Sequence, residues 1–244
     1  MWIDHGKYLE QEAFSRLGAT ALCAGKSFGD AKSLTPDQVT AALELGGRVL
    51  ISTSQTHGDA IVAVRSRERT FFPDCDGLLT DMPDVILYMK FADCLPIFFL
   101  DPEKQVIGIV HAGWKGTLAE IGIKALALME SEYRCDRSKI LIAFGVGISG
   151  RNYEVSPDFY GNFASEFGKT FADLSFLYFK KKLYFDNQKF NRLNFLRAGI
   201  PPEHIFSNDR CTFADPRFFS YRREKNNPGR NAGIIYRTDL SGER

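Results

Sequence analysis

The chain has 244 residues, with 31 lysines and arginines against 30 aspartates and glutamates, so its formal net charge is +1. A balance this close to zero gives no field over the whole surface that would gather nucleic acid or an anionic membrane. The charged N-terminal residues lack the apolar core of a secretory signal, and no apolar run approaches the roughly 20 residues that cross a bilayer. We therefore expect a soluble, cytoplasmic protein without nucleic-acid or membrane partners, folded as a single domain over residues 1–244.

The first half of the chain is rich in predicted strands. Apolar and alternating runs predict strands over residues 47–55, 59–64, 76–80 and 85–91. A hairpin follows, formed by the apolar runs 95–100 and 106–110 around the turn 101–104. A helix is then expected to begin at Thr117, because Glu120 three residues later completes a capping box.

The second half adds helices. Residues 139–148 read as a buried strand, and the next helix has Ser156 as its N-cap, Pro157 in its first turn and Gly168 as its end. Another helix is predicted over 186–202, and the tail alternates strand-like runs around a turn at 226–229. Because strands outnumber helices and adjoin one another, we expect an α+β fold, a mixed β-sheet sandwich with flanking helices.

The predicted hairpin brings a thiol close to an imidazole. With Pro102 and Glu103 at the centre of the turn, Cys94 lies directly opposite His111, with Cβ atoms about 5 Å apart. Such a pair is suited to two chemistries: a zinc site with one open position, or a hydrolase in which His111 activates Cys94 as the nucleophile. A cross-strand pair without a role is the plain alternative.

A third metal ligand would favour zinc. The chain has four histidines, of which His5 lies near the N-terminus and His204 lies in an ordinary helix-to-strand connection. His57 lies between two predicted strands and precedes Gly58, so it is the histidine placed to approach a metal. The plain alternative is a turn histidine in a polar loop.

Further candidates surround this trio. Asp76 is a possible acid or base near the metal, although its place before Gly77 is also typical of a turn. Strand alternation turns Asp93 away from Cys94, which favours a supporting role. Five cysteines without a C-x-x-C pair indicate free thiols, and Cys211 is expected to pack rather than bind metal.

Anion-binding groups are expected near the same helix and in the tail. The free N–H groups of the helix after Gly116 can approach a phosphate, and Lys115 adds positive charge. The tail offers a second set of cations, which are equally consistent with surface charges: Arg222, Arg223 and Arg230.

Four stretches of the chain resemble a known family. QTHGDAIV, DGLLTDMP, FADCLPIFFLDPEKQVIGIVHAGWKGT and FFSYRRE…GR occur in the order found in bacterial multicopper polyphenol oxidase (laccase) domain proteins. The resemblance runs from Gln55 to Ile235 and is most specific from Asp93 to Gly116. It implies a fold shared with the catalytic domain of the cytotoxic necrotizing factor toxins and a zinc site formed by His57, Cys94 and His111.

The resemblance also implies an activity. Family members are expected to be purine nucleoside phosphorylases that act on adenosine, inosine, guanosine and methylthioadenosine with phosphate, and that deaminate adenosine in the same site. The older family label suggests copper, but four histidines cannot supply the several copper ions of an oxidase, so copper oxidation is the least favoured chemistry. A metal-free Cys–His hydrolase or deamidase and a non-catalytic zinc-binding domain remain as alternatives.

Two segments depart from the family pattern. Where members usually carry cysteines before YEV, this chain has Arg151 and Asn152, which predicts an altered pocket wall around an intact zinc site. The usual N-terminal STR.GG segment is not recognisable, and Lys26 is the residue that can stand in for its arginine.

Overall fold

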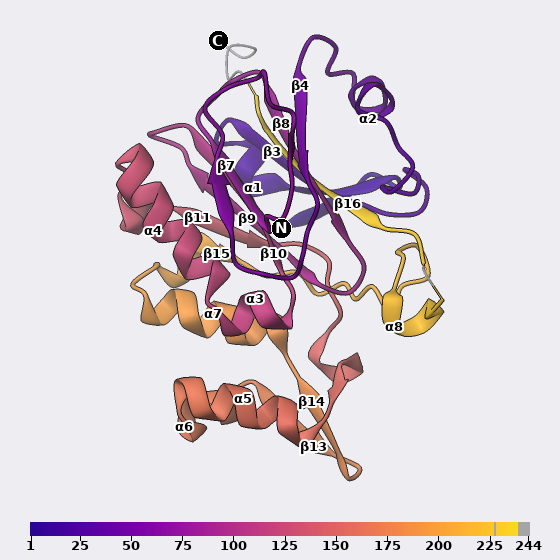
Figure 1. Cartoon of the computed structure of the whole chain (residues 1–244), viewed down its shortest axis with the longest axis vertical. Helices are drawn as coiled ribbons and strands as arrows, with labels where there is room; N and C mark the ends of the chain where they lie inside the picture. Colours follow the sequence, from indigo (N-terminus) through magenta and orange to yellow (C-terminus); the bar gives the residue numbers. More distant parts are fainter. Residues whose placement is uncertain (227, 239–244) are drawn as a thin grey trace.

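The computed structural model describes residues 1–226 and 228–238, and these form two large sheets packed face to face (Figure 1). The seven-stranded sheet has the order β1 (Trp2–Asp4), β2 (Tyr8–Gln11), β3 (Ala19–Ala24), β16 (Asn231–Arg237), β8 (Val85–Phe91), β4 (Val49–Thr53) and β6 (Phe71–Phe72). The six-stranded sheet has the order β15 (Ile205–Phe206), β11 (Leu141–Phe144), β9 (Leu95–Asp101), β10 (Val106–Ala112), β7 (Gly77–Thr80) and β5 (Ile61–Ala63).

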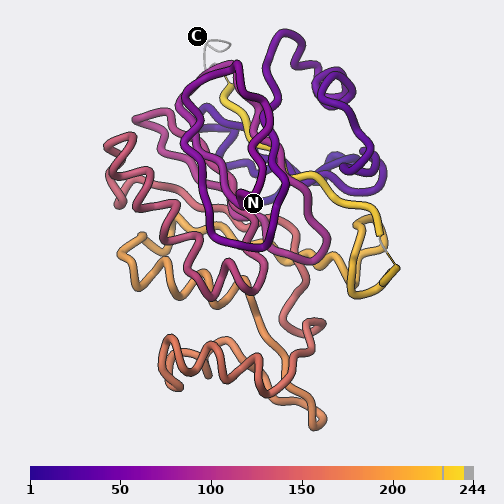
Figure 2. Tube along the Cα trace, viewed as in Figure 1, coloured from indigo at the N-terminus to yellow at the C-terminus, as the bar shows by residue number. Residues whose placement is uncertain are grey.

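Apolar side chains fill the space between the sheets. Leu87 and Ile235 from one sheet pack with Phe98 and Ile109 from the other in a single buried cluster. Helices α4 (Ile121–Tyr133) and α7 (Asn187–Arg197) cover the outer face of the six-stranded sheet, and α2 (Pro36–Ala42) lies beside the seven-stranded sheet. Figure 2 shows the C-terminal strand β16 running beside the N-terminal strand β3, with which it pairs. The expected α+β fold is confirmed.

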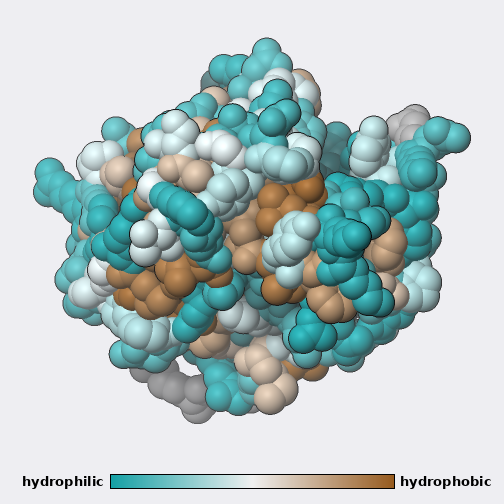
Figure 3. All heavy atoms as spheres, turned by 90° about the horizontal axis from the view of Figure 1, so that it is seen from below, coloured by the Kyte–Doolittle hydropathy of each residue, from teal (hydrophilic) through white to brown (hydrophobic). Residues whose placement is uncertain are grey.

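A third group of elements, which we call the aromatic unit, lies below the sheets. It contains a three-stranded sheet and two helices: β12 (Glu154–Val155), β14 (Lys182–Phe185), β13 (Phe176–Phe179), α5 (Pro157–Phe167) and α6 (Lys169–Asp173). Stacked and edge-to-face rings hold it together, with Phe163 and Phe185 fully buried. The face seen from below carries patches of apolar residues (Figure 3). Within the aromatic unit, Tyr178 and Phe179 are exposed.

Most predicted elements are present. The strands expected in the first half correspond to β4, β5, β7 and β8, and the hairpin to β9 and β10, whose residues are all buried. The Ser156 hydroxyl accepts a hydrogen bond from the N–H of Phe159 at 3.2 Å, and α5 ends at Gly168, as predicted. The strand predicted at 139–148 is shorter, because β11 ends at Phe144. In the described part of the chain no helix is long and apolar enough to cross a membrane.

The predicted capping box at Thr117 is wrong. A short helix, α3 (Trp114–Leu118), already begins after Gly113, so Thr117 lies inside it and donates its hydroxyl hydrogen to Asn187. Glu120 adopts a left-handed conformation with a φ of 56° and separates α3 from α4. The chain therefore turns sharply where the sequence pattern indicated one continuous helix.

The tail also differs from the prediction. Residues Tyr221–Glu224 form the one-turn helix α8, capped by the Ser220 hydroxyl, where strand-like runs were expected. The segment 231–237 is a strand as predicted. Of the turn predicted at 226–229, Asn227 lies outside the described residues.

The hairpin register is shifted from the predicted one. Asp101 pairs with Val106 and His111 pairs with Pro96, so facing residues sum to 207 instead of 205. The loop holds four residues because the Asp101 carboxylate accepts the N–H groups of Glu103 and Lys104 and widens the turn. A shift of two preserves the face of each side chain, so Cys94 becomes a diagonal instead of a direct neighbour of His111.

Candidate active site

His57, Cys94 and His111 meet where the two sheets come together. Cys94 immediately precedes β9, His111 is the sixth residue of β10, and His57 lies on the connection between β4 and β5. Their possible ligand atoms all lie within 4.8 Å of one another. The two imidazole rings are nearly perpendicular, with centroids 4.8 Å apart. The sequence-predicted trio is therefore a real spatial cluster.

A buried carboxylate holds both histidines. Asp76 Oδ1 accepts hydrogen bonds from His111 Nδ1 at 2.7 Å and from the N–H of His57 at 3.0 Å. Its Oδ2 accepts the N–H groups of Thr56 and Gly58 and the Thr56 hydroxyl hydrogen. Because an ionised carboxylate only accepts, His111 Nδ1 carries a proton, and Nε2 is left to face Cys94, where it can carry a second proton or bind a metal.

These contacts set the protonation states. Burial raises the pKa of Asp76, but the hydrogen bonds from His111 and from the loop N–H groups outweigh it and bring the pKa to about 2. Burial likewise raises the pKa of Cys94, but the charge of His111 and the hydrogen bonds from both histidines bring it below its usual range. Cys94 therefore favours the thiolate, which is the form that binds a metal.

Two glycines leave room for the cluster. A Cβ atom on Gly113 would lie 3.2 Å from a His57 ring carbon and 3.3 Å from the sulfur of Cys94. A Cβ atom on Gly116 would lie 2.8 Å from the carbonyl oxygen of Gly58, so this glycine lets α3 pack against the loop that carries His57. The bare Cα atoms form a cradle that a side chain would fill.

The residues present fit a metal ion. Two imidazole nitrogens and one thiolate provide three ligands and leave a fourth position open, as in catalytic zinc sites. The hydrogen bond from His111 to Asp76 is the outer support that metal-binding histidines usually have. Blue-copper centres use a similar donor set, so the donors alone do not select the metal.

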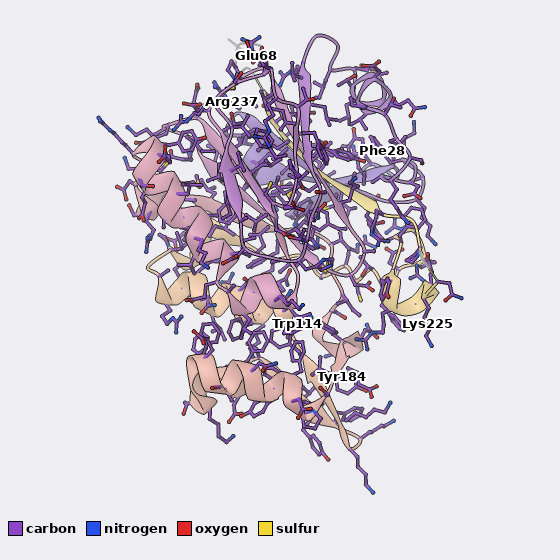
Figure 4. The ribbon with its side chains drawn as sticks, viewed as in Figure 1. Phe28, Glu68, Trp114, Tyr184, Lys225 and Arg237 are labelled. Atoms are coloured by element: carbon purple, nitrogen blue, oxygen red, sulfur yellow. The ribbon has the colours of Figure 1, made fainter. Side chains whose placement is uncertain are left out.

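The cluster opens into a cavity of about 640 Å³, a volume typical of small-molecule sites. Side chains of two kinds line it besides the cluster. The cations are Lys32, Lys90, Arg222 and Arg230, and the aromatic residues are Trp114, Tyr153 and Tyr221. Trp114 is the first residue of α3 and lies beside the aromatic unit (Figure 4), where the centre of its ring is 5.3 Å from that of Phe159.

The family described as multi-copper polyphenol oxidoreductase laccase matches residues 21–238. The chain belongs to this family. It is 32% identical over 202 residues to the purine nucleoside phosphorylase YlmD of Geobacillus stearothermophilus, covering 78% of this chain and 72% of that protein. It is 36% identical over 169 residues to a purine nucleoside phosphorylase of Borreliella burgdorferi, covering 69% of this chain and 72% of that one.

Two solved structures have the same fold. The hypothetical protein YfiH of Bacillus licheniformis superposes with a TM-score of 0.85 at 26% identity, covering 97% of this chain and 99% of the other. YlmD of Geobacillus stearothermophilus superposes with a TM-score of 0.81 at 26% identity, covering 97% and 98%.

One end of the cavity is basic and is built from neighbouring strands. Thr53 ends β4, Lys90 lies near the end of β8, and Arg230 precedes β16, which is the order in which these strands adjoin. Thr53 is fully buried, and its hydroxyl has no hydrogen-bond partner among the described residues. This end therefore combines positive charge with an unused polar group, which suits an anion.

Several predicted anion-binding residues lie elsewhere. Arg222 and Arg230 line the cavity, but Arg223 donates to the backbone carbonyls of residues 212, 213, 215 and 218 and so has a structural place. Lys115 is exposed beside Trp114 and, like Gly116, does not line the cavity. Lys26 forms an ion pair with Glu224. Apart from Arg222 and Arg230, the residues predicted to bind an anion do not line the cavity, so the geometry does not support that role for them.

The remaining candidates have supporting positions. Asp93 accepts hydrogen bonds from Thr212 and from the N–H of Arg222, and it lies in a left-handed bend outside β9. The Cys211 sulfur accepts from the N–H of Ser149 and from Asn152, as expected for a packing cysteine. Asn152, one of the departures from the family pattern, therefore holds a wall segment.

Sequence reasoning missed much of the cavity. Lys90 interrupts the apolar run 85–91 that leads into the Ala92–Cys94 segment, and Tyr153 belongs to the YEV motif, so both had a signal in the sequence. Lys32 lies far from the motifs along the chain, whereas Thr53 comes two residues before QTHGDAIV and Tyr221 lies within FFSYRRE. None of the three shows by its local sequence that it lines the cavity, because only folding brings it there.

We expect Gly113→Ala to lower zinc affinity by roughly tenfold, because its methyl group would press on His57 and Cys94. Competition for zinc with a chromophoric chelator measures this. Gly161→Ala is the matched control, because a Cβ atom there meets nothing within 4 Å. Equal zinc affinity in the two variants would contradict the claim that the cluster needs the space left by Gly113.

Asp76→Asn is expected to lower zinc affinity by about 10- to 100-fold. Either orientation of the amide places its NH₂ group against N–H donors that now bond to the carboxylate, so the His57 loop and the His111 ring lose their anchor. The exposed Asp74→Asn serves as control. Full zinc affinity with a large loss of kcat would indicate instead that Asp76 is an acid or base.

Proposed function

We propose that the protein is a zinc-dependent purine nucleoside phosphorylase. The observation that carries this proposal is a single cavity that joins a His–Cys–His cluster to a basic end and to aromatic side chains. The family relationship supports it, because relatives at 32% and 36% identity are named purine nucleoside phosphorylases. We propose His57, Cys94 and His111 as the zinc ligands.

Phosphorolysis requires the chain to bind an anion and a base on opposite sides of the ribose. An oxygen of phosphate forms a bond to the C1′ atom, the bond to the purine nitrogen breaks, and the purine keeps the electron pair and takes a proton. We propose that Lys32, Lys90 and Arg230, which line the cavity, bind the phosphate. The rings of Tyr153 and Tyr221 offer flat surfaces for the purine.

A bound zinc ion with an open position supplies Lewis acidity toward an oxygen of phosphate or water. The chain's own part is to hold the ligands in place. Asp76 keeps Nδ1 of His111 protonated and fixes the loop of His57. With a pKa of about 2, Asp76 is ionised at neutral pH, so we assign it a positioning role and not that of a proton donor.

The substrates we propose are adenosine, inosine, guanosine and methylthioadenosine. All four present a purine to the aromatic side and a ribose to the cluster. Adenosine deamination in the same cavity is a further part of the proposal: water adds to C6 of the purine, and the C6 amino group takes a proton and leaves as ammonia. The carbon that is attacked then differs, so the nucleoside must present C6 instead of C1′ to the attacking group.

Zinc is preferred over copper because of the number of ligand clusters. An oxidase that reduces dioxygen needs several copper ions, each with its own ligands. In the described residues, one group of three metal-binding side chains is present. His5 pairs with Glu10, and His204 belongs to a 3₁₀ turn (Pro202–His204), so neither histidine joins the cluster.

One observation favours a second candidate, a thiol hydrolase or deamidase. Cys94, His111 and Asp76 are arranged as nucleophile, base and orienting carboxylate, and the pKa of Cys94 is lowered. A metal-free protein with this geometry can attack an acyl or amide carbon through sulfur. Metal removal separates the two candidates, because it abolishes the first activity and leaves the second.

The zinc-loaded protein is expected to convert adenosine and phosphate into adenine and ribose 1-phosphate, with inosine reporting deamination. Chromatography of the products measures both reactions. Cys94→Ser should lower kcat/KM by at least about 100-fold together with zinc content, because the sulfur ligand is lost. Zinc-loaded protein that turns over none of the four nucleosides would contradict the proposal, and activity that survives chelation but not alkylation of Cys94 would favour the thiol hydrolase.

Lys90→Met is expected to raise the KM for phosphate by about tenfold with little change in the KM for adenosine, because a charge-assisted contact is lost at the basic end. Lys115→Met is the matched control, since Lys115 lies outside the cavity. Initial rates at varied phosphate and saturating adenosine provide the measurement. Equal effects of the two substitutions would place the phosphate elsewhere.

A further inference from the structure

Asp93, next to the proposed ligand Cys94, joins three segments of the cavity wall. Its Oδ1 accepts the hydroxyl hydrogen of Thr212 at 2.5 Å, and its Oδ2 accepts the N–H of Arg222 at 2.6 Å. Its carbonyl oxygen accepts the N–H of Ile148 at 2.9 Å. Asp93 has a φ of 80°, a conformation that few residues other than glycine adopt, and this bend directs the carboxylate to α8.

Helix α8 carries part of the proposed purine surface. Tyr221 and Arg222 line the cavity, and the Arg222 guanidinium lies 5.4 Å from the centre of the Tyr153 ring. Arg222 also donates to the carbonyl oxygen of Glu154, so one side chain connects α8 to the aromatic unit. The helix has a single turn and cannot hold this position by itself.

Arg223 ties α8 to the segment that precedes it, so that the two form one body. Arg223 donates to four backbone carbonyls between residues 212 and 218. The two oxygens of Asp93 accept one hydrogen bond from each of these two segments. The Thr212 hydroxyl donates from the segment before α8, and the Arg222 N–H donates from α8 itself. Other contacts also hold this body, among them the Asn231 side chain, which bonds the N–H and the carbonyl of Phe219. Asp93 is the anchor that ties it to the residue next to Cys94.

We propose that Asp93 is a positioning residue for the nucleoside, fixing α8, and with it Tyr221 and Arg222, at a set distance from the metal cluster. This inference rests on the proposed function, because it assigns α8 to the purine. It separates two tasks: Asp76 supports the metal ligands, whereas Asp93 supports the wall that receives the substrate. Loss of Asp93 should weaken nucleoside binding and leave metal binding intact.

Asp93→Gly tests the role of the Asp93 carboxylate most directly. Glycine adopts a φ of 80° freely, so the substitution removes the carboxylate without straining the bend. The KM for adenosine should rise about tenfold, while kcat, the KM for phosphate and zinc affinity stay within about threefold. Asp93→Asn should restore most of the loss, because its amide oxygen can accept the Arg222 N–H while its NH₂ group donates to the Thr212 hydroxyl.

Asp101→Ala is the matched control. Asp101 is a buried carboxylate at the opposite end of β9 and also accepts two backbone N–H groups, so its loss reports general damage to the strand. It should lower stability without changing the KM for adenosine. If Asp93→Gly leaves this KM unchanged, or lowers zinc affinity by the same factor as nucleoside affinity, the proposal is overturned.

Amide hydrogen exchange tests the linkage without enzyme activity. The zinc-loaded full chain should exchange faster over 220–224 in Asp93→Gly than in the wild type or Asp93→Asn, because the Arg222 N–H loses its acceptor. Unchanged exchange would overturn the positioning role even in an active enzyme. Faster exchange in a protein that phosphorolyses no nucleoside would uphold the link to α8 and refute its assignment to the purine, together with the proposed function.

Discussion

The structure of the site depends on the buried Asp76 carboxylate. One of its oxygens accepts a hydrogen bond from the His111 ring and one from the His57 N–H. The other oxygen accepts three, from the N–H and the hydroxyl of Thr56 and from the N–H of Gly58. Hydrogen bonds to a charged group contribute about 1.5–3 kcal/mol each, enough to offset the cost of burying the charge. Through this group a loop of one sheet and a strand of the other become a single rigid support.

Close backbone approach is the second constraint. The Asp76 N–H donates to Ala60 and its carbonyl accepts from His111, so the carboxylate is built into the sheet between β5 and β10. The loop that carries His57 must then pass directly beside α3, and only a residue without a side chain at Gly116 permits this. The His–Cys–His cluster, its carboxylate and the glycines thus form one arrangement in which each part depends on the others.

The sequence predicted the parts of the site that depend on local pattern. The hairpin follows from two apolar runs and a turn. Strand alternation placed Cys94 and His111 on the same face of this hairpin, and a register shift of two residues does not change that face. The loop length could not be predicted because the Asp101 carboxylate, which captures two N–H groups, decides it. The capping box failed because the Thr117 hydroxyl is used by Asn187, a tertiary contact that no local pattern contains.

The cavity was hardest to predict for the same reason. Its basic end takes Thr53, Lys90 and Arg230 from strands that adjoin in the sheet but are far apart along the chain. Arg223 carries the same charge as its neighbour Arg222, and only the backbone carbonyls around it show that its charge is used internally. Charge alone therefore did not separate the arginines that line the cavity from one that lies outside it.

The place of the site follows from how the chain passes between the sheets. Strand β8 belongs to the seven-stranded sheet and β9 to the six-stranded one, so the chain must cross within residues 92–94. The left-handed bend at Asp93 makes this crossing, and it leaves the thiol of Cys94 facing the histidines while the Asp93 carboxylate faces α8. Adjacent residues thus have different partners: Cys94 contacts the two histidines, and Asp93 bonds to the cavity wall at α8.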